Sequence, residues 1–115
     1  MAVTTKELIR YSDSALEARF ASADPATGKV LWSRTLPRSM TLLEIRSELK
    51  PTIGTETDIL ATIESGGLSK KGVNLFYLQN CALLVRWYGV GWYVGAYSVG
   101  GPRRWGAEHR VFSRK

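Results

Sequence analysis

The sequence contains few of the residues that build disulfides, metal sites and catalytic pairs. Its 115 residues include a single cysteine, Cys81, and a single histidine, His109. One cysteine excludes an internal disulfide framework and any zinc site with several cysteine ligands. We therefore expect a protein of the reducing cytoplasm that carries no metal and no cofactor.

Catalytic candidates are equally scarce. Cys81 and His109 could form a nucleophilic pair, with Asn80 or Glu108 as the orienting group. Both lie in predicted strands, where an isolated cysteine usually serves as a small apolar residue and an isolated histidine as a structural one. The carboxylates of the predicted helices have the spacing of solvated helix faces. The sequence therefore favours a protein that is not an enzyme.

Long apolar runs are also absent. The most apolar stretch, residues 81–101, has Arg86 near its middle, several glycines and the alternation of a strand. A membrane-spanning helix requires about 20 mostly apolar residues. The N-terminus lacks the basic start and apolar core of a secretory signal. We expect no membrane partner.

Acidic residues are scarce in the second half of the chain. Residues 61–115 carry two acidic and eight basic residues, whereas residues 1–60 carry eight of each, so the net charge of +6 belongs to the second half. The same half holds nine of the twelve aromatic residues. A one-sided positive field attracts anions, nucleic acid foremost, although it also keeps small proteins soluble.

Length and composition are those of one ordinary folded unit. A chain of 115 residues with 44% hydrophobic residues buries enough surface to fold as a single domain, residues 1–115. The periodicity described below predicts the α+β class, with a C-terminal antiparallel β-meander of about four strands from residue 73. An N-terminal hairpin and two or three short helices, packed on one side of the sheet, complete the predicted fold.

The first 37 residues predict a short helix followed by the hairpin. Thr4 and Glu7 have capping-box spacing, which predicts a helix that ends near Ser12–Asp13. Residues 16–20 and 30–32 then flank a loop with proline early and glycine late, a pattern that favours two paired strands. For residues 14–23 a helix is the alternative.

Two further helices are predicted before residue 67. Thr41 and Glu44 have capping-box spacing, and the apolar residues that follow lie on one helical face until Pro51 ends it. A strand is the alternative for residues 39–50. Thr55 and Asp58 begin the next helix in the same way, and Gly66 supplies its C-terminal cap. Residues 66–72 then form an exposed loop.

From Val73 onward the hydrophobic period changes to two. Four strands are predicted, joined by turns at 79–80, 89–91 and 100–102. They cover residues 73–78, 81–88, 92–99 and 109–114.

The hairpin around Gly89 determines which aromatic side chains share a face. A two-residue turn at Val90–Gly91 pairs Tyr88 with Tyr93 and separates two faces of the sheet. One face is apolar and predicted to be buried: Leu83, Val85, Trp87, Trp92, Val94 and Ala96. The other face carries Arg86, Tyr88, Tyr93 and Tyr97. A three-residue turn, which pairs Tyr88 with Trp92 and mixes the two sets, is the alternative.

The second face is the candidate binding site. It consists of Arg86, Tyr88, Tyr93 and Tyr97, flanked by Arg103, Arg104 and Arg110. Because tyrosine and arginine are enriched at interface hot spots, we expect a non-catalytic interaction or assembly module, self-associating as a homodimer or bound to a protein partner through this face or an edge strand. A nucleic-acid-binding module is the first alternative, since tyrosines stack on bases and arginines hold phosphates. A small-ligand-binding domain is the second, and plain cross-strand packing explains the same residues without any ligand.

Overall fold

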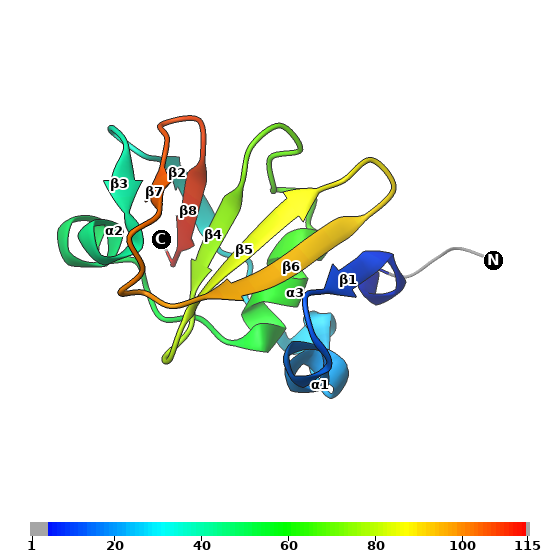
Figure 1. The fold of residues 1–115 in the computed structure, drawn as a ribbon. Coiled ribbons are helices and arrows are strands. Elements are labelled where there is room, and N and C mark those ends of the chain that lie inside the picture. Colours follow the sequence, from blue (N-terminus) through cyan, green and yellow to red (C-terminus); the bar gives the residue numbers. More distant parts are fainter. Residues whose placement is uncertain (1–4, 115) are drawn as a thin grey trace.

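A computed structural model describes residues 5–114 of the chain (Figure 1). Helices and strands alternate irregularly, which confirms the α+β class. The helices are α1 (Ser14–Ala21), α2 (Leu42–Leu49) and α3 (Glu56–Glu64), with 3-10 turns at Thr5–Leu8 and Pro25–Thr27. The strands are β1 (Ile9–Tyr11), β2 (Trp32–Thr35), β3 (Met40–Thr41), β4 (Asn74–Tyr77), β5 (Ala82–Trp87), β6 (Trp92–Tyr97), β7 (Arg104–Trp105) and β8 (Arg110–Ser113). Among residues 5–114, no helix has the length and apolar content of a membrane span.

Six strands form one mixed sheet in the order β1-β6-β5-β4-β8-β2. The consecutive strands β4, β5 and β6 are antiparallel, as the predicted meander requires. The fourth strand does not continue that meander, because β1 already pairs in parallel with the outer edge of β6. The chain instead crosses the sheet as β7, which pairs with β3, and β8 joins in parallel beside β4 (Figure 1).

Both faces of the sheet bury apolar side chains, because β4 and β5 are apolar on each side. On the α1/α3 face, residues such as Phe76, Val85 and Phe112 pack against Phe20 of α1 and Ile59 of α3. On the α2 face, a second core forms between the sheet, α2 and the β3–β7 pair. It includes Met40, Ile45, Leu75, Leu84, Trp105 and Val111. The prediction that all helices cover one side is therefore wrong, since α2 lies on the opposite face from α1 and α3.

The predicted N-terminal hairpin is not formed. Residues 14–21 form α1 instead, because the Asp13 side chain accepts the Leu16 amide at 2.8 Å and caps the helix. Leu16 and Phe20, four residues apart, are both buried on one helical face. The strand expected at residues 30–32 begins at Trp32 and pairs with β8. The burial of Leu16 and Phe20 on one helical face therefore stabilises a helix here, and the alternation that favoured a strand is not realised.

The predicted first helix is shorter than expected. Only a 3-10 turn forms, at Thr5–Leu8, and the chain then becomes the edge strand β1. The proposed capping residue Thr4 lies outside the described residues. Ile9 is buried against the α1/α3 core, so tertiary pairing with β6 replaces the expected helical turn.

The other two helices begin where their caps predict. Thr41 caps α2 in a complete capping box, in which its hydroxyl accepts the Glu44 amide and the Glu44 carboxylate accepts the Thr41 amide. Thr55 caps α3 by accepting the Asp58 amide at 3.2 Å. Gly66 follows α3 with a φ of 82°, the left-handed conformation that ends helices.

The β5–β6 hairpin has a two-residue turn, one position earlier than predicted. Tyr88 donates its amide to the carbonyl of Gly91 at 3.0 Å, so the central residues are Gly89 and Val90. Gly89 has a φ of 102°. Arg86 therefore pairs with Tyr93, and the predicted Tyr88–Tyr93 pairing is wrong. Moving a turn by one position shifts the pairing by two residues, which leaves every side chain on its predicted face.

The loop between α1 and β2 is tied to α3 by close backbone contacts. Lys29 donates its amide to the buried Asp58 carboxylate, and Leu31 donates its amide to the buried Thr62 hydroxyl, both at 2.9 Å. A Cβ atom added to Gly28 would lie 2.3 Å from the carbonyl oxygen of Thr57. Glycine is therefore required where this loop meets the first turn of α3.

Replacing Gly28 with alanine should destabilise the fold. The added methyl group meets backbone rather than a flexible side chain, so we expect Gly28→Ala to lower the free energy of unfolding by about 1–3 kcal/mol. The measurement is urea unfolding followed by tryptophan fluorescence. Gly100→Ala is the matched control, because a Cβ there would have no neighbour closer than 3.9 Å. Equal stability of the two variants would contradict the proposed contact.

Candidate functional site

One row of side chains crosses β1, β6 and β5 on the α2 face. Arg10 pairs with Tyr93, and Tyr93 pairs with Arg86, so all three side chains leave the sheet on the same side. The row lies beyond the part of this face that α2 and β7 cover. Three neighbours extend it into what we call the arginine–tyrosine face: Arg10, Arg86, Arg103, Tyr88, Tyr93 and Tyr97.

Each arginine of this face lies over a tyrosine ring. The guanidinium of Arg10 is 5.9 Å from the centroid of Tyr88, and that of Arg86 is 5.6 Å from the centroid of Tyr93. Arg103 is 5.7 Å from the Tyr97 ring, and it donates a hydrogen bond of 3.3 Å to the Tyr97 hydroxyl. These are distances at which a cation is attracted to the face of an aromatic ring.

Arg103 also holds the face against the core beneath it. Its guanidinium lies 4.6 Å from the centroid of the buried Trp105 ring. Trp105 in turn meets Tyr97 edge to face, with ring centroids 5.7 Å apart. The outer end of the face is thereby fixed to the α2-side core, whereas Arg10 and Arg86 have no comparable anchor among the described residues.

Two adjacent hollows follow the arginine–tyrosine face. The first, of about 400 Å³, is lined by Arg10, Tyr11, Arg86, Tyr88 and Tyr93. The second, of about 280 Å³, is lined by Val73, Leu84, Arg86, Tyr93, Tyr97 and Arg103. Because Arg86 and Tyr93 belong to both, the hollows adjoin, and we call them together the groove; no carboxylate is among these lining residues.

Gly95 leaves room for the two tyrosines of β6. A Cβ atom at this position would lie 3.3 Å from Cε1 of Tyr93 and 3.8 Å from the Tyr97 ring. The rings therefore lie over the glycine backbone from both sides, as expected for a glycine inside a strand. This packing sets the floor of the groove between Tyr93 and Tyr97.

Several carboxylates of the described residues pair with cations outside this face. Arg104 lies 3.3 Å from Glu44, Arg38 lies 2.6 Å from Glu48, and Arg19 lies 3.0 Å from Glu56. Between residues 5 and 114, no ion pair involves the arginines of the arginine–tyrosine face. The positive charge of the groove is therefore not neutralised by the described part of the protein.

Five of the seven predicted site residues come together in this groove. They are Arg86, Tyr88, Tyr93, Tyr97 and Arg103.

Arg104 and Arg110 do not join the other five. Arg104 donates to the hydroxyl and carbonyl oxygens of Ser39 and pairs with Glu44 beside α2. Arg110 pairs with Asn74, which pairs with Val85 of the α1/α3 core, so Arg110 lies on the opposite face of the sheet.

Arg10 was missed in the sequence because residues 8–11 were assigned to a helix. In β1 it alternates with Ile9 and Tyr11, which point to the α1/α3 side. The signal that could have revealed it is this short apolar–basic–aromatic alternation, which is too brief to distinguish a strand from one turn of helix.

The chain's only cysteine and histidine make separate contacts. Cys81 is half-buried, and its sulfur lies 3.8 Å from the Arg19 guanidinium. His109 accepts the Val73 amide through Nδ1 at 2.9 Å, and its Nε2 lies 3.2 Å from Glu108. Both sets of contacts connect segments of the fold. Within residues 5–114, no group of three metal-ligating side chains gathers.

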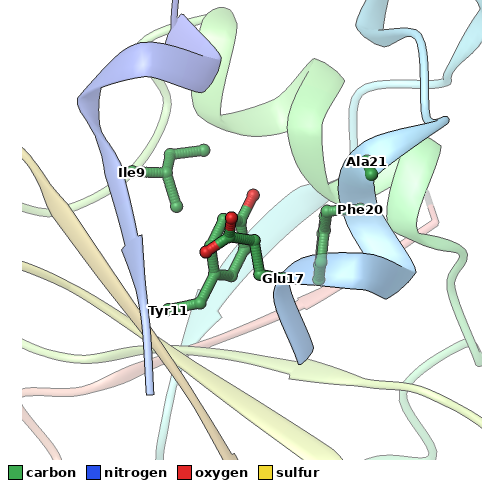
Figure 2. Close-up of a pocket in the computed structure, with 5 residues that line it drawn as sticks. All are labelled: Ile9, Tyr11, Glu17, Phe20 and Ala21. Atoms are coloured by element: carbon green, nitrogen blue, oxygen red, sulfur yellow. The ribbon is translucent and has the colours of Figure 1, made fainter. Parts of the chain in front are cut away.

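A separate pocket of about 240 Å³ lies between β1 and α1, on the α1/α3 side. It is lined by Ile9, Tyr11, Glu17, Phe20 and Ala21 (Figure 2). In the view of Figure 2 the Glu17 carboxylate overlaps the Tyr11 ring, and both side chains line the same pocket. Burial, and to a smaller extent the negative charge of Glu17, raise the pKa of Tyr11 to about 12.

Comparisons of the chain with protein-family models, with curated proteins and with solved structures find no significant match.

The raised pKa of Tyr11 predicts a loss of stability in alkali. Unfolded tyrosine releases its proton near pH 10, whereas folded Tyr11 retains it until about pH 12. The free energy of unfolding should fall across this interval, and the advantage of the wild type over Tyr11→Phe should shrink by about 1–2 kcal/mol. Urea unfolding at several pH values measures the difference.

Glu17→Gln is the control for the cause of this shift. It removes the smaller contribution and leaves burial in place, so it should reduce the pH effect without abolishing it. A difference between wild type and Tyr11→Phe that stays constant from pH 10 to 12 would show that the folded protein does not retain this proton.

Proposed function

We propose that this protein is a nucleic-acid-binding module that holds a single strand in the groove of the arginine–tyrosine face. The observation that carries the proposal is the arrangement of three arginines, each over a tyrosine, along a groove without a carboxylate. The groove presents cations for phosphates and flat rings for bases. Single-stranded nucleic acid is the anion that uses both.

The tyrosines favour a single strand over a duplex. A base can stack on a side chain only when its own face is not covered by the next base, as in loops and single strands. Each such stack contributes about 1–3 kcal/mol. Tyr93 and Tyr97 are four residues apart on one strand, a separation of about 13 Å at the usual rise. The groove therefore offers several contacts along an extended strand.

The arginines have the freedom that phosphate binding needs. Arg10, Arg86 and Arg103 are exposed, and none of the ion pairs among residues 5–114 involves them. A phosphate can replace the weak attraction between guanidinium and ring with a charge-assisted hydrogen bond. The tyrosine ring that the guanidinium leaves is then open to a base. Movement of the guanidinium away from the ring therefore allows both the phosphate contact and the stacking of a base.

Binding of an oligonucleotide should weaken steeply as salt is added. Three phosphate contacts on a single strand predict a slope of about −2 for log K against log salt concentration. The measurement is fluorescence anisotropy with labelled oligouridylate and oligothymidylate of about 12 nucleotides. The triple variant Arg10→Ala, Arg86→Ala and Arg103→Ala should bind about tenfold or more weakly, with a slope near zero.

The matched control removes three arginines from elsewhere. Arg34→Ala, Arg46→Ala and Arg110→Ala lower the net charge equally but leave the groove intact, so binding should remain close to wild type. Equal losses in the two triple variants would overturn the proposal, because they would indicate attraction by net charge alone. Binding of an acidic peptide but not of either oligonucleotide would assign the groove to a protein partner instead.

A specific feature favours self-association as a second candidate function. Trp32 is 58% exposed on β2, the strand at the far edge of the six-stranded sheet from β1. Leu36 donates its amide to His109, which places the amides of even-numbered residues of β2 toward β8. The amides of Ser33 and Thr35 therefore face outward, where an exposed edge can pair with another strand.

Ser33→Pro tests pairing at this edge. Proline removes the outward amide of residue 33 but none of the hydrogen bonds to β8. If a second copy pairs with β2, the variant should be monomeric at concentrations where the wild type is dimeric. Light scattering coupled to gel filtration measures the mass, with Ser33→Thr as the control. A wild-type mass that stays monomeric as concentration rises would dismiss this candidate.

A further inference from the structure

The pocket between β1 and α1 has an apolar floor and an acidic rim. Ile9 and Phe20 are almost fully buried and form the floor. Tyr11 forms one wall, with its ring centroid 5.3 Å from that of Phe20. Glu17 also lines the pocket and is exposed to solvent (Figure 2). The pocket lies on the other face of β1 from Arg10, and Tyr11 lines both the pocket and the first hollow of the groove.

Glu17 has no cationic partner among the described residues. Its nearest basic neighbour in the helix, Arg19, pairs with Glu56 of α3 at 3.0 Å. Arg10 leaves β1 on the opposite face and lies over Tyr88. Most other carboxylates of the described chain either pair with a cation or cap a helix, as Asp13 does for α1. The pocket is therefore lined by one exposed carboxylate together with the Tyr11 ring.

We propose that this pocket binds a primary alkylammonium group. The positive nitrogen would lie between the Glu17 carboxylate and the face of the Tyr11 ring, both of which attract cations. The alkyl chain would cover Ile9 and Phe20. An anion would be repelled by Glu17, and a neutral chain of the same length would gain only the apolar contact. The pocket is therefore selective for charge.

The same chemistry occurs in small free amines and in lysine side chains of proteins. The volume of about 240 Å³ accommodates a chain of four carbons with its ammonium group in either case. The test therefore uses both sources. n-Butylammonium represents the free amine, and a glycine-flanked lysine peptide with blocked termini represents the side chain.

The experiment is an NMR titration of the full chain at constant ionic strength. We expect n-butylammonium to shift the signals of Tyr11 and Ala21, whereas n-butanol at the same concentration should shift them far less. Glu17→Gln should weaken the affinity for n-butylammonium about fivefold. Glu64→Gln, which removes an exposed carboxylate at the end of α3, is the matched control and should bind like the wild type.

The outcomes separate the sources and decide the proposal. Comparable binding of the lysine peptide would assign the pocket to a protein's lysine, and binding of n-butylammonium alone would assign it to a small amine. Equal shifts with n-butanol and n-butylammonium would overturn the proposal. Unchanged affinity in Glu17→Gln, with the fold verified by its NMR spectrum, would overturn it as well.

Discussion

The turn at Gly89–Val90 is the constraint on which the groove depends. A positive φ at the first central residue, without one at the second, is the signature of type II′ hairpins, and only glycine adopts it without strain. Val90 in that first position would place a β-branched residue in a conformation it avoids. The turn therefore fixes Arg86 opposite Tyr93, and β1 adds Arg10 to the same row. Without this register, the cations and rings would not alternate along one groove.

The groove exists because the second covering layer is incomplete. The sheet buries apolar residues on both faces near β4 and β8, and α2 with the β3–β7 pair covers only that part of one face. The end of the sheet formed by β1, β6 and the last residues of β5 extends beyond α2 and the β3–β7 pair. Its exposed positions are the ones at which the sequence changes from leucine and valine to arginine and tyrosine. Along these strands, apolar residues therefore lie under α2 and the β3–β7 pair, and arginine and tyrosine lie where the sheet is exposed.

Sequence patterns of a few residues correctly predicted the helix caps and the faces of the hairpin strands, because neighbouring residues determine both. Thr41 and Thr55 cap α2 and α3 as their spacing indicates, and the face assignments of Trp92, Tyr93 and their neighbours were correct because alternation survives a two-residue shift. Two of the misses concern site residues, Arg110 and Arg10. Arg110 was placed with the tyrosines because a meander was assumed, whereas β1 occupies the edge that β8 would have needed. Arg10 was missed because three residues of an edge strand carry too little periodicity to outweigh a capping-box pattern.

The edge strand β1 contributes to two surfaces whose charged residues differ in sign. Its middle residue, Arg10, contributes to a groove rich in cations, and its flanking residues, Ile9 and Tyr11, contribute to a pocket whose exposed charge is Glu17. Side chains of consecutive strand residues point to opposite faces, so a strand of three residues can serve both. Its outer edge is not paired with another strand in the described chain. A change in the position of β1 would therefore move lining residues of both the groove and the pocket.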